Sequence, residues 1–315
     1  MEYDVFRECV IGKLREIVAE NEEVKLIANT KNNDIKLWAV VIKEQEKNIL
    51  PTIYLERYYE EYNTSICDIG VIAQEIYSFY KNHKNDVEFD FEEFLDFNFI
   101  RDKIFCKIIN TSKNLKLLED VPHVDTMDLS IIFYCMVKED KCGDQTFTIH
   151  NAHLDRWDMD VQSLYKISLE NTKRNHGHEL KSMSSMVTEI LSNNRFENAD
   201  KNEEISAADK DFIDEGEDDE KFPMYVLTNK KRLFGATCIL YKDVLEEFAN
   251  KMDADIFILP SSIHEIILIP VKNITDLDNY KKMVCEVNEN EVDPEEILSE
   301  NVYIFDRSKN SVILP

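Results

Sequence analysis

The residues most able to do chemistry form a polar cluster between two apolar segments. Ser261, Ser262, His264 and Glu265 are the residue types that supply nucleophile, base and carboxylate in acyl-transfer enzymes. On a strand, Ser262 and His264 would lie roughly 6 to 7 Å apart at Cα, at about 3.3 Å per residue, and Glu265 would point to the other face. A Pro-Ser-Ser turn whose hydroxyls bond backbone groups is the favoured interpretation. A ligand or partner surface and a catalytic role are the alternatives.

A second set of candidate residues follows Pro122. His123 with Asp125 and Asp128 could perform general acid–base chemistry, because a carboxylate can orient an imidazole that exchanges protons near neutral pH. The same residue types are common where a turn enters a strand, and the turn is favoured. His123 stays a catalytic candidate beside the cluster at 260–265.

Three consecutive basic residues, Lys230, Lys231 and Arg232, form the candidate ligand-binding site. Their charge is opposite to that of the whole chain, so they are the best place for a phosphate or carboxylate to bind. In a hairpin turn such a cluster is usually solvated, and that interpretation is favoured.

Five residues could in principle bind a metal ion: His150, His153, His176, His178 and Glu179. Imidazole and carboxylate suit zinc or a similar ion. A predicted helix of about 18 Å, at 1.5 Å per residue, separates the two groups. We therefore expect exposed loop histidines and no metal.

An aromatic cluster at Tyr58, Tyr59 and Tyr62 lies beside Glu60 and Glu61. Rings in an acidic setting could hold a cationic ligand. Tyr side chains more often cover the edge of a core with their hydroxyls in water, and we expect that here.

The charge of the chain limits its partners. It has 63 acidic and 37 basic residues, a net charge of −26, and 43% hydrophobic residues, enough to exclude wholesale disorder. A surface this negative repels phosphates and anionic lipid, so we expect binding to neither nucleic acid nor membrane. It favours a protein partner of basic charge.

The termini, apolar runs and cysteines indicate a cytoplasmic protein. The first residues carry acids and no apolar segment typical of a secretory signal. The longest apolar run is 131–137, whereas a membrane span needs about 20 residues. Seven cysteines without a CxxC pair suggest buried thiols in a reducing compartment.

The six glycines are too widely spaced for the common phosphate-binding loops. A P-loop and a dinucleotide fingerprint both need closely spaced glycines, because only glycine lets backbone N–H groups approach phosphate. The GxSxG elbow of α/β-hydrolases is absent as well. We expect no cofactor.

Apolar periodicity predicts an α+β fold with mixed or antiparallel sheets flanked by helices. We expect helices over residues 4–20, 69–80, 112–119, 161–172, 180–191, 244–252 and 277–287, and a short one from Asp293. We expect strands over residues 24–28, 35–43, 49–56, 103–109, 128–137, 146–150, 224–228, 236–241, 255–259, 263–271, 302–305 and 312–314. A helix is the alternative for 103–109. The strands 224–228 and 236–241 should pair.

One segment differs in composition from the rest. Residues 197–221 hold twelve acids and three bases, and few apolar side chains. Such a run is typical of a solvated linker. We therefore predict two α/β subdomains, 1–196 and 222–315, joined by the acidic segment 197–221.

Four blocks carry a resemblance to a known family: residues 51–56 (PTIYLE), 118–123 (LEDVPH), 224–229 (MYVLTN) and 259–265 (LPSSIHE). Together they span most of the chain. They resemble an uncharacterised family, a domain of unknown function common in gut Clostridia. The resemblance implies an intracellular bacterial protein and brings no activity with it.

These observations favour a non-catalytic, cytoplasmic interaction or regulatory protein. One alternative is a small hydrolase or transferase that uses the polar turn at 260–265. Another is an acidic mimic of nucleic acid that inhibits a DNA-handling protein.

Overall fold

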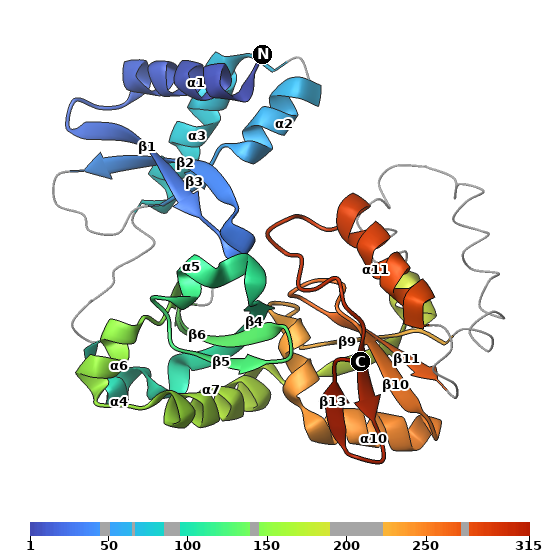
Figure 1. The fold of residues 1–315 in the computed structure, drawn as a ribbon. Coiled ribbons are helices and arrows are strands. Elements are labelled where there is room, and N and C mark those ends of the chain that lie inside the picture. The colour runs from blue at the N-terminus through green and yellow to red at the C-terminus, as the bar shows by residue number, and fades with distance from the viewer. Residues whose placement is uncertain (45–50, 65–66, 85–94, 139–144, 190–222, 272–276) are drawn as a thin grey trace. The chain divides into compact units, whose positions relative to one another are not determined.

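The computed structural model describes residues 1–44, 51–64, 67–84, 95–138, 145–189, 223–271 and 277–315 (Figure 1). Its contacts divide the chain into two compact units, Met1–Phe94 (unit 1) and Leu95–Pro315 (unit 2). Both contain helices and antiparallel sheets, which confirms the predicted α+β class.

Unit 1 packs three helices against one face of a small sheet (Figure 1). The sheet has the order β1-β2-β3 and is antiparallel. Apolar residues at helical spacing in α1 and α3 meet the inward side chains of β1 and β2, and Asp68 caps α3 as predicted. The elements are α1 (Tyr3–Ile17), β1 (Glu22–Thr30), β2 (Lys36–Glu44), β3 (Ile53–Tyr54), α2 (Glu56–Thr64) and α3 (Ile69–His83).

The first half of unit 2 is built around β6, which is almost wholly buried along its length. β6 pairs with β4, β5 and β7, all antiparallel, so it is the centre of the sheet. The elements are α4 (Phe97–Ile100), β4 (Ile104–Asn110), α5 (Leu115–Leu118), β5 (His123–Thr126), β6 (Leu129–Lys138), β7 (Gln145–Thr148), α6 (Asn151–Trp157) and α7 (Val161–His176).

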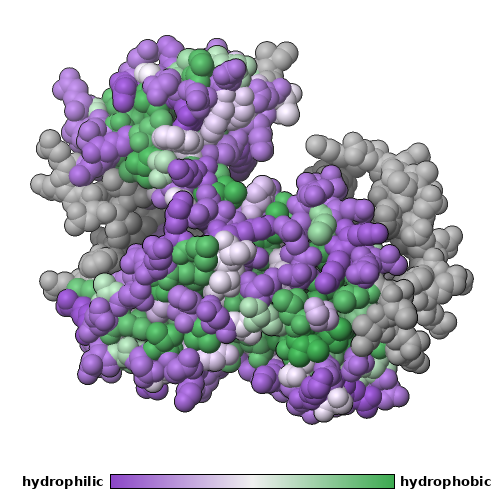
Figure 2. Space-filling model, in the orientation of Figure 1, coloured by the Kyte–Doolittle hydropathy of each residue, from purple (hydrophilic) through white to green (hydrophobic). Residues whose placement is uncertain are grey.

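The second half of unit 2 contains a six-stranded antiparallel sheet of order β13-β12-β10-β11-β9-β8. Figure 2 shows hydrophilic residues over much of the visible face of each unit, with apolar residues interspersed among them. The elements are β8 (Glu179–Ser182), β9 (Tyr225–Thr228), the 3₁₀ helix η6 (Gly235–Leu240), α10 (Lys242–Met252), β10 (Asp255–Leu259), β11 (Ile266–Val271), α11 (Leu277–Asn290), β12 (Tyr303–Asp306) and β13 (Ser311–Ile313).

The division into units differs from the predicted one. The expected boundary was the acidic segment 197–221, between 1–196 and 222–315. Strand β8 precedes that segment and β9 follows it, yet the two pair from Glu179↔Thr228 to Ser182↔Tyr225. Both sides of the acidic segment therefore belong to one sheet, a long-range pairing that leaves no local signal. Residues 190–222 lie outside the described residues.

Several predicted elements also change type. The predicted helix 180–191 begins as strand β8 and is helical over 183–189, while 190–191 lie outside the described residues. The predicted strand 236–241 is η6, and β9 pairs with β8 and β11 instead. A turn replaces the short helix predicted at Asp293. Within the described part of the predicted strand 49–56, which begins at residue 51, β3 is the strand.

Candidate functional site

The polar cluster at 260–265 is an irregular segment between β10 and β11, the latter beginning only at Ile266. Ser262 is buried, and its Oγ accepts a hydrogen bond of 3.0 Å from the backbone N–H of His264. The Ser262 N–H in turn donates to the Glu265 carbonyl at 3.4 Å. Ser261 donates its N–H to the Leu259 carbonyl at 3.1 Å. The Ser262 hydroxyl also hydrogen-bonds the Glu265 side chain, so these hydrogen bonds of Ser262 all stay within the turn.

Both nitrogens of the His264 ring have partners. Nδ1 accepts from the Phe234 N–H at 3.2 Å, and Nε2 lies 3.3 Å from Oε1 of Glu296. Because Nδ1 is an acceptor, the neutral ring carries its proton on Nε2. The ring also stacks on Phe234, with centroids 5.8 Å apart and planes 12° apart. The His264 ring thus links two loops in this structure, and neither ring nitrogen has Ser262 as its partner.

The pKa of the Glu265 carboxyl in this turn is shifted. Burial raises the pKa of its carboxyl and the charge of Glu296 adds to that rise, while His264, a hydrogen bond with Ser262 and Arg232 act in the opposite direction. The structure therefore brings two carboxylates, an imidazole and a guanidinium into one neighbourhood.

Gly235 explains how closely these loops approach. A Cβ at this position would lie 2.1 Å from Oγ1 of Thr228 and 2.3 Å from the carbonyl oxygen of His264. The same Thr228 hydroxyl donates to that carbonyl at 2.7 Å, and Ala236 N–H donates to the Ile263 carbonyl at 3.2 Å. Only glycine fits at this crossing.

The basic residues Lys230, Lys231 and Arg232 are not concentrated into one positive site. Arg232 Nη2 lies 3.6 Å from Glu179 and 3.9 Å from Glu189. The Lys230 side chain runs beside Gly177, and the Lys231 N–H donates to Asn229 Oδ1. The two glutamates come from β8 and the helical turn after it, which only the tertiary fold brings to Arg232.

His123 and Asp125 are neighbours, but Asp128 turns elsewhere. His123 Nε2 lies 3.8 Å from Asp125 Oδ1, and Nδ1 lies 3.0 Å from the Val121 carbonyl. The Asp128 carboxylate instead accepts from the Ser299 hydroxyl at 2.7 Å, the Asn301 amide at 3.0 Å and the Tyr303 hydroxyl at 2.8 Å. The predicted trio is therefore split.

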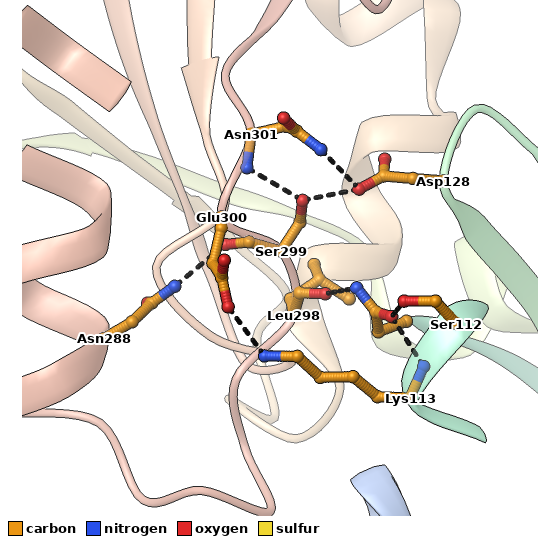
Figure 3. Close-up of polar contacts among 9 residues, drawn as sticks. Ser112, Lys113, Asp128, Asn288, Leu298, Ser299, Glu300 and Asn301 are labelled. Carbon is orange, nitrogen blue, oxygen red and sulfur yellow. Dashed lines mark hydrogen bonds and ion pairs between the residues drawn. The ribbon is translucent and has the colours of Figure 1, made fainter. Parts of the chain in front are cut away.

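Asp128 belongs to a polar network that joins the two halves of unit 2, called here the polar junction (Figure 3). Asn110 at the end of β4 donates to the Leu298 carbonyl at 3.0 Å, and Asn288 on α11 donates to the Ser299 carbonyl at 2.9 Å. Burial raises the pKa of Tyr303, so its hydroxyl stays protonated and donates to Asp128. These residues hold the segment before β12 against the β4 and β5–β6 loops.

The five predicted metal-ligand candidates fall into separate settings. His150 Nδ1 lies 2.7 Å from Asp120 Oδ2, and the backbone N–H of His150 donates to His153 Nδ1 at 2.9 Å. His176 is buried and stacks on Phe105, whereas Glu179 pairs with Lys181 and Arg232. Within the described residues, no group of three or more His, Cys, Asp or Glu side chains could hold a metal ion.

The buried thiols are poor nucleophiles. Burial raises the pKa of Cys106 to about 11, and the pKa values of Cys135 and Cys238 to about 12. All three are therefore protonated near neutral pH, whereas nucleophilic attack needs the thiolate.

Unit 1 contains a cavity of about 720 Å³ between α1 and the start of α3. Cys9, Gly12, Tyr62 and Cys67 are among its lining residues. None of the candidate catalytic or basic residues lines it. Tyr58, Tyr59 and Tyr62 pack against the core of this unit, as expected for rings at a core edge.

A comparison with protein families shows the family to which the chain belongs. The model of a family of unknown function, DUF5688, matches residues 3–307. The chain belongs to this family. No curated protein and no solved structure matches it. The predicted resemblance to an uncharacterised family is confirmed, and the family supplies no activity to test against the site.

A row of aromatic rings in this DUF5688 chain was missed at the sequence level. The ring of Trp157 lies 5.8 Å from that of Phe97 and 5.4 Å from that of His153, which lies 5.9 Å from Phe147. These residues come from α4, β7 and α6, so their sequence separation hides them. The spacing of four between His153 and Trp157 was the one local signal, because it places both on one helix face.

Among the helices of the described residues, none is both long and apolar enough to cross a membrane.

Proposed function

We propose that this protein is a non-catalytic interaction or regulatory protein of the bacterial cytoplasm that binds a basic protein partner. The observation that carries the proposal is the net charge of −26. Opposite charge on a partner would accelerate encounter and favour the correct orientation, whereas nucleic acid and anionic lipid would be repelled.

The ion pairs within the chain support this proposal. Many of its cations already have carboxylate partners: Lys81 contacts Glu22 at 2.7 Å, Lys173 contacts Asp243 at 2.6 Å, and Arg232 lies near Glu179. Because acids outnumber bases so strongly, such pairing leaves the excess carboxylates to solvent or to a partner. The local setting of Arg232 also weakens the basic cluster as an anion site.

The polar turn supplies a second candidate function, a hydrolase or transferase. It is favoured by Glu265, whose raised pKa beside His264 and Glu296 is a common feature of acid–base sites. Turnover of a panel of p-nitrophenyl esters and phosphates, lost in Glu265→Gln, would support it. A panel without turnover would favour the interaction protein.

The test of the leading proposal is to purify the chain at its natural level from its own cells at low salt. We expect a stoichiometric complex with a protein of high isoelectric point, which dissociates as added salt screens the charges. A monomer without a stoichiometric partner would contradict the proposal.

Deletion of 197–221 separates this proposal from the nucleic acid mimic. A mimic whose charge lies mainly in that segment would lose its partner on deletion. If the folded units carry the binding surface, the complex survives with reduced affinity, because only the long-range attraction is lost.

A further inference from the structure

The aromatic row in unit 2 is partly exposed. Phe97, Phe147, His153 and Trp157 are each neither fully buried nor fully exposed, so each ring presents part of its surface. His153 and Trp157 stack with planes 25° apart. Half-exposed stacked rings provide both apolar area and the negative faces that attract a cation.

Carboxylates adjoin this row. Asp96, which caps α4, immediately precedes Phe97, and Asp158 immediately follows Trp157; both are exposed. Asp155 is exposed as well, but it is two positions from His153 and from Trp157 on α6 and so lies on the opposite face of that helix. Asp120 reaches the row through its 2.7 Å contact with His150, which neighbours His153. The single base of α6 is Arg156.

His153 serves this row as a neutral ring. Burial lowers the pKa of His153 and the neighbouring His150 lowers it further, against the effect of Asp120. Its Nδ1 already accepts the His150 N–H. At neutral pH the imidazole therefore does not repel an approaching cation.

We propose that this aromatic–acidic surface, comprising Phe97, Phe147, His153 and Trp157 with Asp120 and Asp158, binds a lysine- or arginine-rich segment of a protein partner. The inference rests on the proposed function and locates its contact. The cationic groups meet ring faces and carboxylates, and their alkyl stems cover the partly exposed rings. A phosphate-bearing ligand is disfavoured because the same carboxylates repel it.

The chain offers a direct optical test, because its two tryptophans are Trp38 and Trp157. Trp38 lies in unit 1 under the Arg7 guanidinium, so Trp38→Phe keeps an aromatic ring there and leaves Trp157 as the sole indole. This variant is titrated with a twelve-residue peptide of alternating lysine, arginine and serine, and with a matched glutamate peptide. We expect the basic peptide to change the Trp157 emission saturably and the acidic one to leave it unchanged.

Matched charge variants locate the contact. In the Trp38→Phe chain, Asp120→Asn with Asp158→Asn should raise the Kd for the basic peptide about five- to tenfold, since two carboxylates of the surface are lost. Both residues are exposed, and asparagine tolerates the left-handed backbone of Asp158. The control is Glu247→Gln with Glu289→Gln, exposed residues on α10 and α11. It removes the same charge and should change Kd less than about twofold.

The outcomes separate the two proposals. Equal loss of affinity in both double variants, or peptide binding without change in Trp157 emission, would overturn this surface and leave the basic partner standing. If the chain purifies from its own cells without any basic partner, the proposed function itself is overturned. Phe97→Leu keeps apolar volume but removes a ring face, so a several-fold weaker Kd there would support the aromatic contribution.

Discussion

The turn at 260–265 and the aromatic–acidic surface both contain a histidine and carboxylates, but these side chains have opposite roles in the two regions. In the turn, Ser262 bonds backbone groups and the Glu265 side chain, and both ring nitrogens of His264 have partners from other loops. At the aromatic–acidic surface, His153 contributes a stacked ring, and Asp120 and Asp158 are exposed to solvent. Polar groups that are satisfied internally hold loops in place, whereas exposed ones beside apolar rings can meet a partner. The catalytic-looking sequence is thus the more structural of the two regions.

The largest effect in this comparison should come from Gly235→Ala. The new Cβ would overlap Thr228 and the His264 carbonyl, so the loops must separate and stability should fall by about 3 kcal/mol or more. Urea denaturation measures it. The control is Gly12→Ala in α1, where a Cβ meets nothing within 4 Å and a helix should gain roughly 0.5–1 kcal/mol. Similar behaviour of the two variants would contradict the structural role of the turn.

Asp128→Ala should have the next largest effect. It removes the acceptor of three hydrogen bonds, one of them from the buried Tyr303 hydroxyl, at a cost of about 2–3 kcal/mol. Asp125→Ala, in the same hairpin but with its side chain 64% exposed, should cost less than about 1 kcal/mol. Denaturant midpoints of the two variants test this, and equal losses would refute the polar junction.

His153 should give a smaller, pH-dependent effect. Because its folded-state pKa lies below the unfolded value of 6.5, its contribution is present above that pH and is lost as pH falls through the folded-state pKa. His153→Phe keeps the ring and should flatten the decline of stability below pH 6.5. Denaturation at pH 7.5 and pH 5 measures the difference, and an unchanged slope would contradict the assignment.

Glu265→Gln should have the smallest effect and the opposite sign. The folded-state pKa of Glu265 lies above its unfolded value of 4.5, so ionisation costs stability as pH rises through that window. The neutral amide should therefore raise stability at pH 7 by less than about 1 kcal/mol, with the gain disappearing below pH 4.5. A marked loss at pH 7 would show that the carboxylate is needed in the turn.

Local pattern predicted what depends on near neighbours. The Asp68 cap, the buried strand β6 and the amphipathic α10 all follow from spacing within one element. The pairing of β8 with β9 across the acidic segment does not follow from such spacing. This pairing places both sides of the acidic segment in one unit and brings the glutamates close to Arg232. Residues 236–241, predicted as a strand, are apolar because they lie in or next to the buried 3₁₀ helix η6. A short apolar run does not distinguish a buried strand from a buried helix.

The aromatic row shows the same limit at a candidate site. Phe97 and Trp157 meet across sixty residues, so neither residue is conspicuous in the chain by itself. Tyr58, Tyr59 and Tyr62, adjacent in the sequence, pack on a core instead. Function at a surface depends on which side chains the fold brings together.

Zero-length carbodiimide crosslinking of the purified complex, read by peptide mass spectrometry, tests the central claim most directly. It joins carboxylates to lysine amines only when they are in contact. We predict crosslinks from Asp120 or Asp158 to lysines of the partner, and their loss in the Asp120→Asn, Asp158→Asn chain. Crosslinks confined to other carboxylates, such as Glu247 and Glu289, would contradict the account.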